Sequence, residues 1–181
     1  MKSVLISIKP KWCELIASGK KTIEVRKTRP KCDMPFKCHV YCTKDKDISF
    51  WTGKRYAYAD DRSHNLFDVC GNGKVIGEFI CNKIDRLAVC GYDNRNTELR
   101  RVDDNWKVYD LDYDYLNKCQ LSLCNLKKYS SGGGLYCWHI SDLVIYDKPK
   151  SIKEFYHYGV RRGAKITRPP QSWCYAEELK E

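Results

Sequence analysis

The first residues alternate between apolar and polar side chains, which is the pattern of a β-strand. Residues 3–8 read SVLISI, are rich in branched side chains and place Val4, Ile6 and Ile8 on one face. Lys9 and the proline after it end the run. The chain is therefore expected to open with a strand.

A short helix is predicted over residues 11–18. Trp12, Leu15 and Ile16 fall on one helical face, and the proline that precedes the segment suits a first helical turn. Gly19 suits the left-handed position that follows a last turn. The helix is expected to dock through Trp12.

Residues 20–27, KKTIEVRK, return to a period of two. Ile23 and Val25 share an apolar face of the expected strand. The opposite face then carries Thr22, Glu24 and Arg26. An ionic face of this kind is typical of a binding or catalytic site, but a plain amphipathic edge strand has the same pattern, and the pattern alone does not separate the two.

The rest of the chain has a less regular pattern. It predicts strands at 37–43, 75–84 and 135–146, a helix at 122–129 capped by Ser122, and a helical turn within 152–158. Polar stretches at about 44–70 and 92–118 are interpreted as insertions, and a basic tail covers 159–181. The sequence has no internal repeat and no regular strand–helix alternation. We therefore expect one α+β domain over 1–181, a small mixed β-barrel.

Charge and cysteine content narrow the class of protein. The 181 residues include 33 Lys and Arg against 23 Asp and Glu, a net charge of +10, which favours anionic partners such as RNA or nucleotides. The 11 cysteines are an odd number in a chain longer than most disulfide-rich domains. The first apolar run is too short for a signal peptide or a membrane span. These features predict a cytoplasmic protein with no membrane association.

Candidate metal and cofactor motifs are weak. The best apparent cluster of metal-ligand types is Cys32, Cys38, His39 and Cys42, but the last three lie on a predicted strand. At about 3.3 Å per residue, Cys38 and Cys42 are about 13 Å apart, too far for one zinc ion. The cysteines are therefore expected to be thiols, with no metal and no cofactor.

Four motifs together resemble a known family. They are SIKP at 7–10, GKKTIEVRK at 19–27, the pair Gly77-Glu78, and YCWHIS at 136–141. This set resembles the ASCH domain, a member of the PUA-like superfamily. The segment ITRPPQSWCY at 166–175 is similar to the ending of ASCH proteins found in bacterial and phage genomes.

The resemblance implies a small PUA-like β-barrel with a helix across its mouth. It also implies a basic cleft between that helix and the strand of the GKKT motif. The residues expected to line this cleft and bind RNA or a nucleotide are Lys9, Lys20, Lys21, Thr22, Glu24, Arg26, Trp138, Ser172 and Trp173. Lys and Arg can contact phosphate, a carboxylate can accept from a base amino group, and Trp can stack on a base.

Two other functions stay open at this point. Similar small amidohydrolases that act on N4-acylated cytidines carry a Thr where this chain has Glu24, so their mechanism does not transfer directly. If the protein hydrolyses a modified nucleoside or RNA, Glu24 is expected to be the general base and Lys21 or Lys20 to stabilise the oxyanion. Strand periodicity would place Lys20 beside Glu24, and a bulge after Gly19 is needed to bring Lys21 there. The remaining alternative is an adaptor that binds a protein through the insertions.

Overall fold

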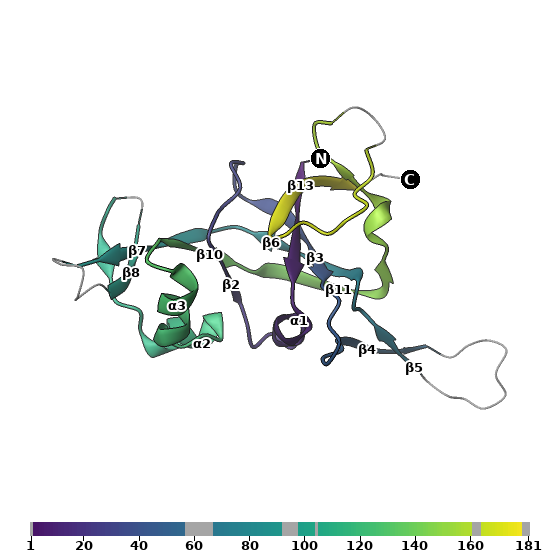
Figure 1. Cartoon of the computed structure of the whole chain (residues 1–181), viewed down its shortest axis with the longest axis horizontal. Helices are drawn as coiled ribbons and strands as arrows, with labels where there is room; N and C mark the ends of the chain where they lie inside the picture. The colour runs from purple at the N-terminus through teal and green to yellow at the C-terminus, as the bar shows by residue number, and fades with distance from the viewer. Residues whose placement is uncertain (1, 57–66, 92–97, 104, 161–163, 179–181) are drawn as a thin grey trace. The chain divides into compact units, whose positions relative to one another are not determined.

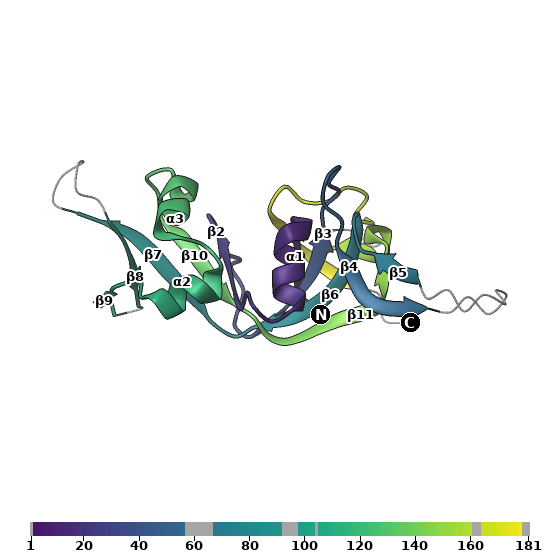
Figure 2. The same ribbon diagram turned by 90° about the horizontal axis from the view of Figure 1, so that it is seen from below.

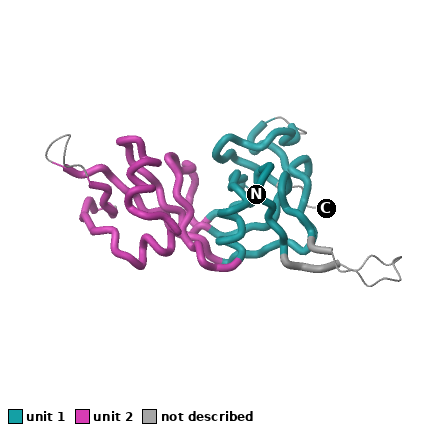
Figure 3. Tube along the Cα trace, turned by 60° about the horizontal axis from the view of Figure 1, so that its bottom comes forward, with its two compact units in different colours: residues 1–17, 36–80, 142–181 teal, residues 18–35, 81–141 magenta. Residues whose placement is uncertain are grey.

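The chain folds into two compact units. The computed structural model describes residues 2–56, 67–91, 98–103, 105–160 and 164–178. The first unit takes residues 1–17, 36–80 and 142–181, and the second takes 18–35 and 81–141 (Figure 3). Parts of both predicted insertions and of the basic tail lie outside the described residues.

A six-stranded sheet forms the first unit. Its elements are β1 (Ser3–Ile8), α1 (Pro10–Ala17), β3 (Phe36–Cys42), β4 (Trp51–Tyr56), β5 (Phe67–Cys70), β6 (Lys74–Cys81), β11 (Ser141–Lys150), the 3₁₀ turn η1 (Ile152–Glu154), β12 (Phe155–His157) and β13 (Trp173–Glu178) (Figure 1). The strand order is β11-β6-β3-β1-β13-β12, and β4 pairs with β5 as a separate hairpin. That hairpin lies in the stretch predicted as the first insertion.

Strand β1 matches its predicted bounds but is buried on both faces. It lies between β3, which is parallel to it, and β13, which is antiparallel. All six residues are buried, whereas the alternation predicted one polar face. The two serines satisfy their hydroxyl groups inside the sheet: Ser3 Oγ donates to the carbonyl of Ala176 and Ser7 Oγ to that of Pro170, each at 2.7 Å. Short hydroxyl side chains that bond to nearby carbonyls are compatible with a fully covered strand.

Helix α1 begins at Pro10 and is followed by Gly19 with φ of +72°, as predicted. Its buried residues are Pro10, Cys13 and Ile16, while Trp12 and Leu15 are only partly buried. Docking of the helix through Trp12 stays a prediction. The thiol of Cys13 lies 3.6 Å from the carbonyl oxygen of Ile8.

A five-stranded antiparallel sheet forms the second unit. Its elements are β2 (Ile23–Arg26), β7 (Ile84–Cys90), β8 (Glu98–Val102), β9 (Val108–Tyr109), α2 (Tyr113–Cys119), α3 (Leu123–Ser130) and β10 (Leu135–His139). The strand order is β2-β10-β7-β8-β9. Figure 2 shows α2 and α3 on the same side of this sheet.

The helices of the second unit cover an apolar sheet face. Leu87 of β7, Leu99 of β8 and Cys137 of β10 pack with Tyr115 of α2 and Leu126 of α3. Ser122 caps α3, because its side chain accepts from the amide of the third helical residue, as the sequence predicts. This packing fixes the sheet that positions the candidate site.

The α+β fold class is confirmed, but the strands of the described residues form open sheets instead of the expected closed barrel. The sequence predicts that most of the segment 85–121 is an insertion. Its described part forms most of β7 together with β8, β9 and helix α2. Strands β7, β8 and β9 continue the sheet beyond β10, on the side away from β2. Strands β2 and β10 therefore belong to a different sheet from the one that forms the first unit.

Three further findings bear on the sequence predictions. All 11 cysteines are free thiols. Within the described residues, no group of three or more His, Cys, Asp or Glu side chains is arranged to hold a metal ion. None of the helices in that part of the chain has the length and apolar character needed to cross a membrane.

Candidate functional site

The predicted ionic residues of β2 form a buried cluster. Glu24 lies between two cations, with Oε2 3.4 Å from Nζ of Lys21 and Oε1 3.0 Å from Nε of Arg26. Lys21 also donates to the carbonyls of Ile23 at 2.8 Å and Cys119 at 2.6 Å. The exposed fractions are 2% for Lys21, 6% for Glu24 and 8% for Arg26. Their charges are thus engaged with one another and with backbone carbonyls.

Lys21, and not Lys20, is the lysine beside Glu24. The predicted period-two pattern began at residue 20, but β2 begins at Ile23, so the residues before it are not held to strand geometry. Lys21 therefore turns inward, and Lys20 is exposed. The backbone of Thr22 is hydrogen-bonded on both sides. Its amide donates to the carbonyl of Lys118, and its carbonyl accepts from the amide of Ile140.

The other residues of the predicted cleft are divided between the units. Lys9, Ser172 and Trp173 belong to the first unit, where Lys9 is exposed and the other two are partly buried. Trp138 belongs to the second unit and is 0% exposed. A cleft formed by all of these residues together stays a prediction.

A pocket of about 540 Å³ lies in the second unit. This volume is within the range of about 300–1,000 Å³ that is usual for small-molecule sites. Its lining residues come from the β2–β3 segment, from β7 and the turn before it, from the β8–β9 hairpin and from β10. They are Arg29, Met34, Asn82, Lys83, Ile84, Asp85, Arg86, Arg101, Val102, Asp103, Trp106, Tyr109 and Tyr136.

Each arginine of this pocket lies over an aromatic ring of the same pocket. The guanidinium carbon is 5.3 Å from the ring centre for Arg86 over Trp106. The corresponding distances are 4.9 Å for Arg101 over Tyr109 and 5.9 Å for Arg29 over Tyr136. Strand pairing supports this arrangement, because Arg101 is directly opposite Tyr109 in the β8–β9 ladder.

The three guanidinium groups remain available for an anion. Among the residues that the structure describes, none of the three is paired with a carboxylate. Arg26, in contrast, is buried against Glu24. Guanidinium groups without a carboxylate partner, beside one exposed and two partly buried rings, suit recognition of a group that carries both negative charge and an aromatic surface.

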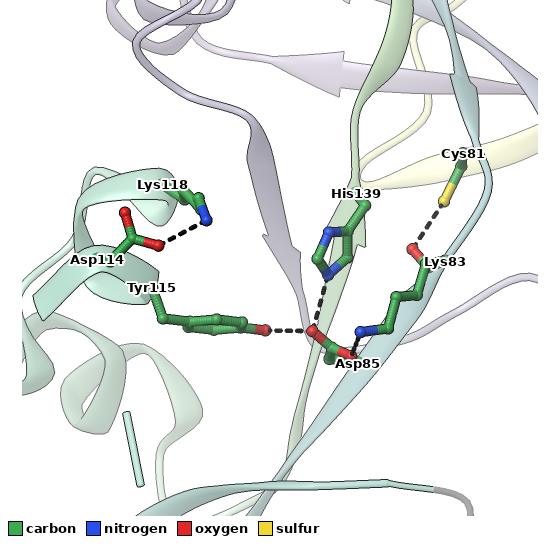
Figure 4. A network of polar contacts seen from close by, with 7 residues as sticks. All are labelled: Cys81, Lys83, Asp85, Asp114, Tyr115, Lys118 and His139. Carbon is green, nitrogen blue, oxygen red and sulfur yellow. Dashed lines mark hydrogen bonds and ion pairs between the residues drawn. The ribbon is translucent and has the colours of Figure 1, made fainter. Parts of the chain in front are cut away.

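The carboxylate of Asp85 in the pocket wall is already satisfied from within the unit. It accepts from the hydroxyl of Tyr115 at 2.9 Å, and Nε2 of His139 lies 2.7 Å from the same oxygen. Its other oxygen is 2.9 Å from Nζ of Lys83 (Figure 4). The contacts join α2, β10 and the start of β7 in one polar network.

The pKa values of Asp85 and Tyr115 are shifted in opposite directions. Burial alone would raise the pKa of Asp85, but the hydrogen bonds from His139, Lys83 and Tyr115 outweigh burial and hold that pKa well below its ordinary value. Burial is also the largest cause that raises the pKa of Tyr115. Asp85 therefore stays ionised at neutral pH while the Tyr115 hydroxyl remains a donor.

The second carboxylate of the pocket shapes the β8–β9 turn. Asp103 Oδ1 accepts from the amides of Asn105 and Lys107, both at 2.9 Å, and Oδ2 accepts from the hydroxyl of Tyr109 at 3.0 Å. Trp106 within this turn has φ of +61° and is 72% exposed. A left-handed tryptophan is costly in free energy, and such strain is characteristic of functional sites. The turn holds the indole outward although burial would favour it inside.

Comparison with known proteins shows which family part of the chain resembles. A family model described as the ASCH domain matches residues 6–60. Over these residues the chain is similar to the ASCH domain. Among curated proteins, none matches the chain.

Solved structures of ASCH proteins share its fold. The crystal structure of ASCH from Zymomonas mobilis has a TM-score of 0.54 and 20% sequence identity, covering 99% of this chain and 88% of that chain. A serine-to-alanine variant from the same organism has a TM-score of 0.53 and 19% identity, covering 99% and 89%. A tyrosine-to-phenylalanine variant gives 0.53 and 19%, covering 100% and 92%. At this identity the likeness is one of fold.

Most of the pocket lies outside the segment that matches the ASCH family model. Only Arg29 and Met34 among its lining residues fall within residues 6–60. The sequence did not point to Arg101, Trp106 and Tyr109, because the stretch 92–118 is interpreted as an insertion, with protein binding as the alternative function. The available signal was the interleaving of basic and aromatic residues over 100–109, RRVDDNWKVY, which is typical of nucleic-acid-binding surfaces.

Proposed function

We propose that this ASCH-domain protein binds single-stranded RNA and takes an unpaired nucleotide into the pocket of its second unit. The family match supports a nucleic-acid-binding role in general. The observation that carries the proposal is the pairing of three arginines with Trp106, Tyr109 and Tyr136 around one pocket.

Phosphate recognition is supported by a difference between the acidic and the basic side chains of the pocket. The two carboxylates of the pocket are saturated by their own neighbours, whereas the guanidinium groups are not paired with carboxylates in the described residues. A ligand therefore meets cations that can bind phosphate and carboxylates whose oxygens are already hydrogen-bonded. The net charge of +10 on the chain favours the approach of the same ligands.

Base recognition is supported by Trp106. Its indole is exposed at the tip of a turn, and a base can stack on an exposed aromatic face regardless of its identity. Bases in a duplex are already stacked on each other, so a splayed or single-stranded base is the form that such a pocket accepts. The expected ligand is therefore unpaired RNA.

Fluorescence anisotropy with a short labelled single-stranded RNA tests the proposal. Affinity is expected to fall as salt rises, with a log–log slope of about −0.7 for each phosphate contacted. Trp106→Ala is expected to weaken binding by about tenfold or more, since stacking on one aromatic side chain contributes about 1–3 kcal/mol per base.

Trp51→Ala is the matched control, because Trp51 is an exposed tryptophan of the first unit that does not line the pocket. Its affinity for RNA is expected to equal that of the wild type. If the two tryptophan variants bind equally well, or if affinity does not change with salt, the pocket is not the RNA site and the proposal is wrong.

Hydrolysis and an adaptor role remain predictions from the sequence. In the structure the carboxylate assigned as a general base, Glu24, is held between Lys21 and Arg26. Both oxygens of this carboxylate contact buried cations, so the geometry favours an ion-pair role for Glu24 over a catalytic one.

A further inference from the structure

A second, smaller pocket adjoins the first within the second unit. It has a volume of about 290 Å³ and is formed by the segment before β3 together with the first residue of β7. Its lining residues are Arg29, Pro30, Lys31, Cys32, Asp33, Met34 and Ile84. Its size is at the lower end of the usual range for small-molecule sites, so it suits one base or sugar more than a complete large ligand.

The two pockets share a wall made of Arg29, Met34 and Ile84. Met34 is 46% exposed and Ile84 is partly buried, so the wall offers apolar surface on which a base can pack. Arg29 is exposed and adds a positive charge at the boundary. A ligand that occupies both pockets has to pass this arginine.

Given the proposed function, on which this inference rests, we propose that the two pockets are subsites for consecutive nucleotides and that Arg29 binds the phosphodiester between them. The larger pocket takes one nucleotide beside Trp106, and the smaller one takes the base or ribose of its neighbour. The recognised unit is thus a dinucleotide step of single-stranded RNA, not a free mononucleotide.

The chemistry of the boundary supports a phosphodiester at this point. Arg29 lies over the ring of Tyr136 with 5.9 Å between its guanidinium carbon and the ring centre, and it has no carboxylate partner among the described residues. A guanidinium group can donate two parallel hydrogen bonds to the two non-bridging oxygens of a phosphodiester. A guanidinium group that lies over a tyrosine ring can still present its N–H edge to such a phosphate.

The length of the ligand tests the inference by isothermal titration calorimetry or competition anisotropy. The probes are adenosine 5′-monophosphate, with one base and a doubly charged phosphate, and the dinucleoside monophosphate ApA, with two bases and one charge. Simple charge attraction favours the mononucleotide. The two-subsite model predicts that ApA binds at least about tenfold more tightly.

Arg29→Ala is the diagnostic variant. It is expected to reduce the affinity for ApA, divided by the affinity for the mononucleotide, to about one. A ratio is used because a loss of affinity in the larger pocket affects both ligands equally and leaves the ratio unchanged. Arg168→Ala is the matched control, because Arg168 is an exposed arginine of the first unit, and its ratio is expected to match that of the wild type.

The outcomes separate this inference from the proposed function. Equal or weaker binding of ApA, or an unchanged ratio in Arg29→Ala, overturns the two-subsite model. Binding of the mononucleotide with a Trp106-dependent affinity would leave the proposed function standing in either case. Absence of binding for both probes and for longer RNA overturns the two proposals together.

Discussion

Glu24 illustrates how burial changes the role of a charged residue. The carboxylate contacts Lys21 and Arg26, and all three side chains are almost fully buried. The positive charge of Lys21 is further shared with the carbonyls of Ile23 and Cys119. Removing the single anion leaves two buried cations without their counter-charge, which is the costly way to disrupt a buried ion pair.

We therefore expect Glu24→Gln to destabilise the protein by about 3 kcal/mol, because the amide keeps the shape but not the charge. Thermal unfolding followed by circular dichroism measures the loss, and RNA affinity is expected to stay unchanged in the folded fraction. Glu14→Gln on the exposed side of α1 is the control and should unfold like the wild type. A normal melting temperature combined with lost RNA binding would instead support Glu24 as a member of the predicted cleft.

At the scale of elements, the second unit is held together by a polar contact as well as by its apolar core. Asp85 at the start of β7 accepts from Tyr115 of α2 and lies 2.7 Å from His139 at the end of β10. The ionised carboxylate thus links one helix to two strands. Local sequence patterns do not reveal this link, since the three residues are separated by at least 24 positions along the chain.

The contribution of Asp85 to stability should depend on pH. Because its pKa is lower in the folded protein than the ordinary value of about 3.9, its stabilising effect is fully present above about pH 5 and is lost as the pH falls toward the lower folded value. Asp85→Asn is therefore expected to lower the melting temperature clearly at pH 7 and progressively less between pH 4 and pH 3. A series of thermal melts over pH 3–8 measures this difference.

Asp114→Asn provides the control for that series. Asp114 pairs with Lys118 on the exposed side of α2, at 2.6 Å, and an exposed pair of this kind contributes little to stability (Figure 4). Its melting curve should follow the wild type at every pH. Parallel pH profiles for wild type and Asp85→Asn would show that the carboxylate is not a stabilising acceptor.

At the scale of the whole molecule, neither compact unit is a continuous stretch of chain. The first is assembled from three segments and the second from two, so the chain passes from one unit to the other after residues 17, 35, 80 and 141. A unit made of separated segments gains its packing only when the intervening chain is also ordered. This connectivity agrees with the expectation of a single domain over 1–181, which stays a prediction.

Cooperative unfolding tests that expectation. We expect one urea transition in which Asp85→Asn in the second unit and Gly77→Ala in the first lower the same midpoint. Gly77 is a suitable probe because a Cβ there would overlap the carbonyl oxygen of Val144 on β11. Two separate transitions, each shifted by only one of the variants, would show that the units unfold independently.

Local features of the chain were predictable from sequence because short-range chemistry decides them. The bounds of β1, the start of α1, the left-handed Gly19 and the Ser122 cap follow from side-chain alternation and from turn and capping preferences. The ASCH motifs, which lie mostly in buried strands, identified the fold class. Strands β7 to β9 were missed, because their pattern is interrupted by charged residues that line a pocket.

The sequence by itself therefore determined the resemblance to the ASCH domain, the α+β class, the basic character and the elements whose patterns are local. Only the tertiary structure decided which charged side chains are buried against an opposite charge and which line a pocket. Arg26 and Arg86 are indistinguishable as residue types, yet one is buried against Glu24 and the other lies over Trp106 in a pocket. The physical reason is that the free energy of a charged side chain depends on burial and on its partners, and strand pairing between distant segments supplies both.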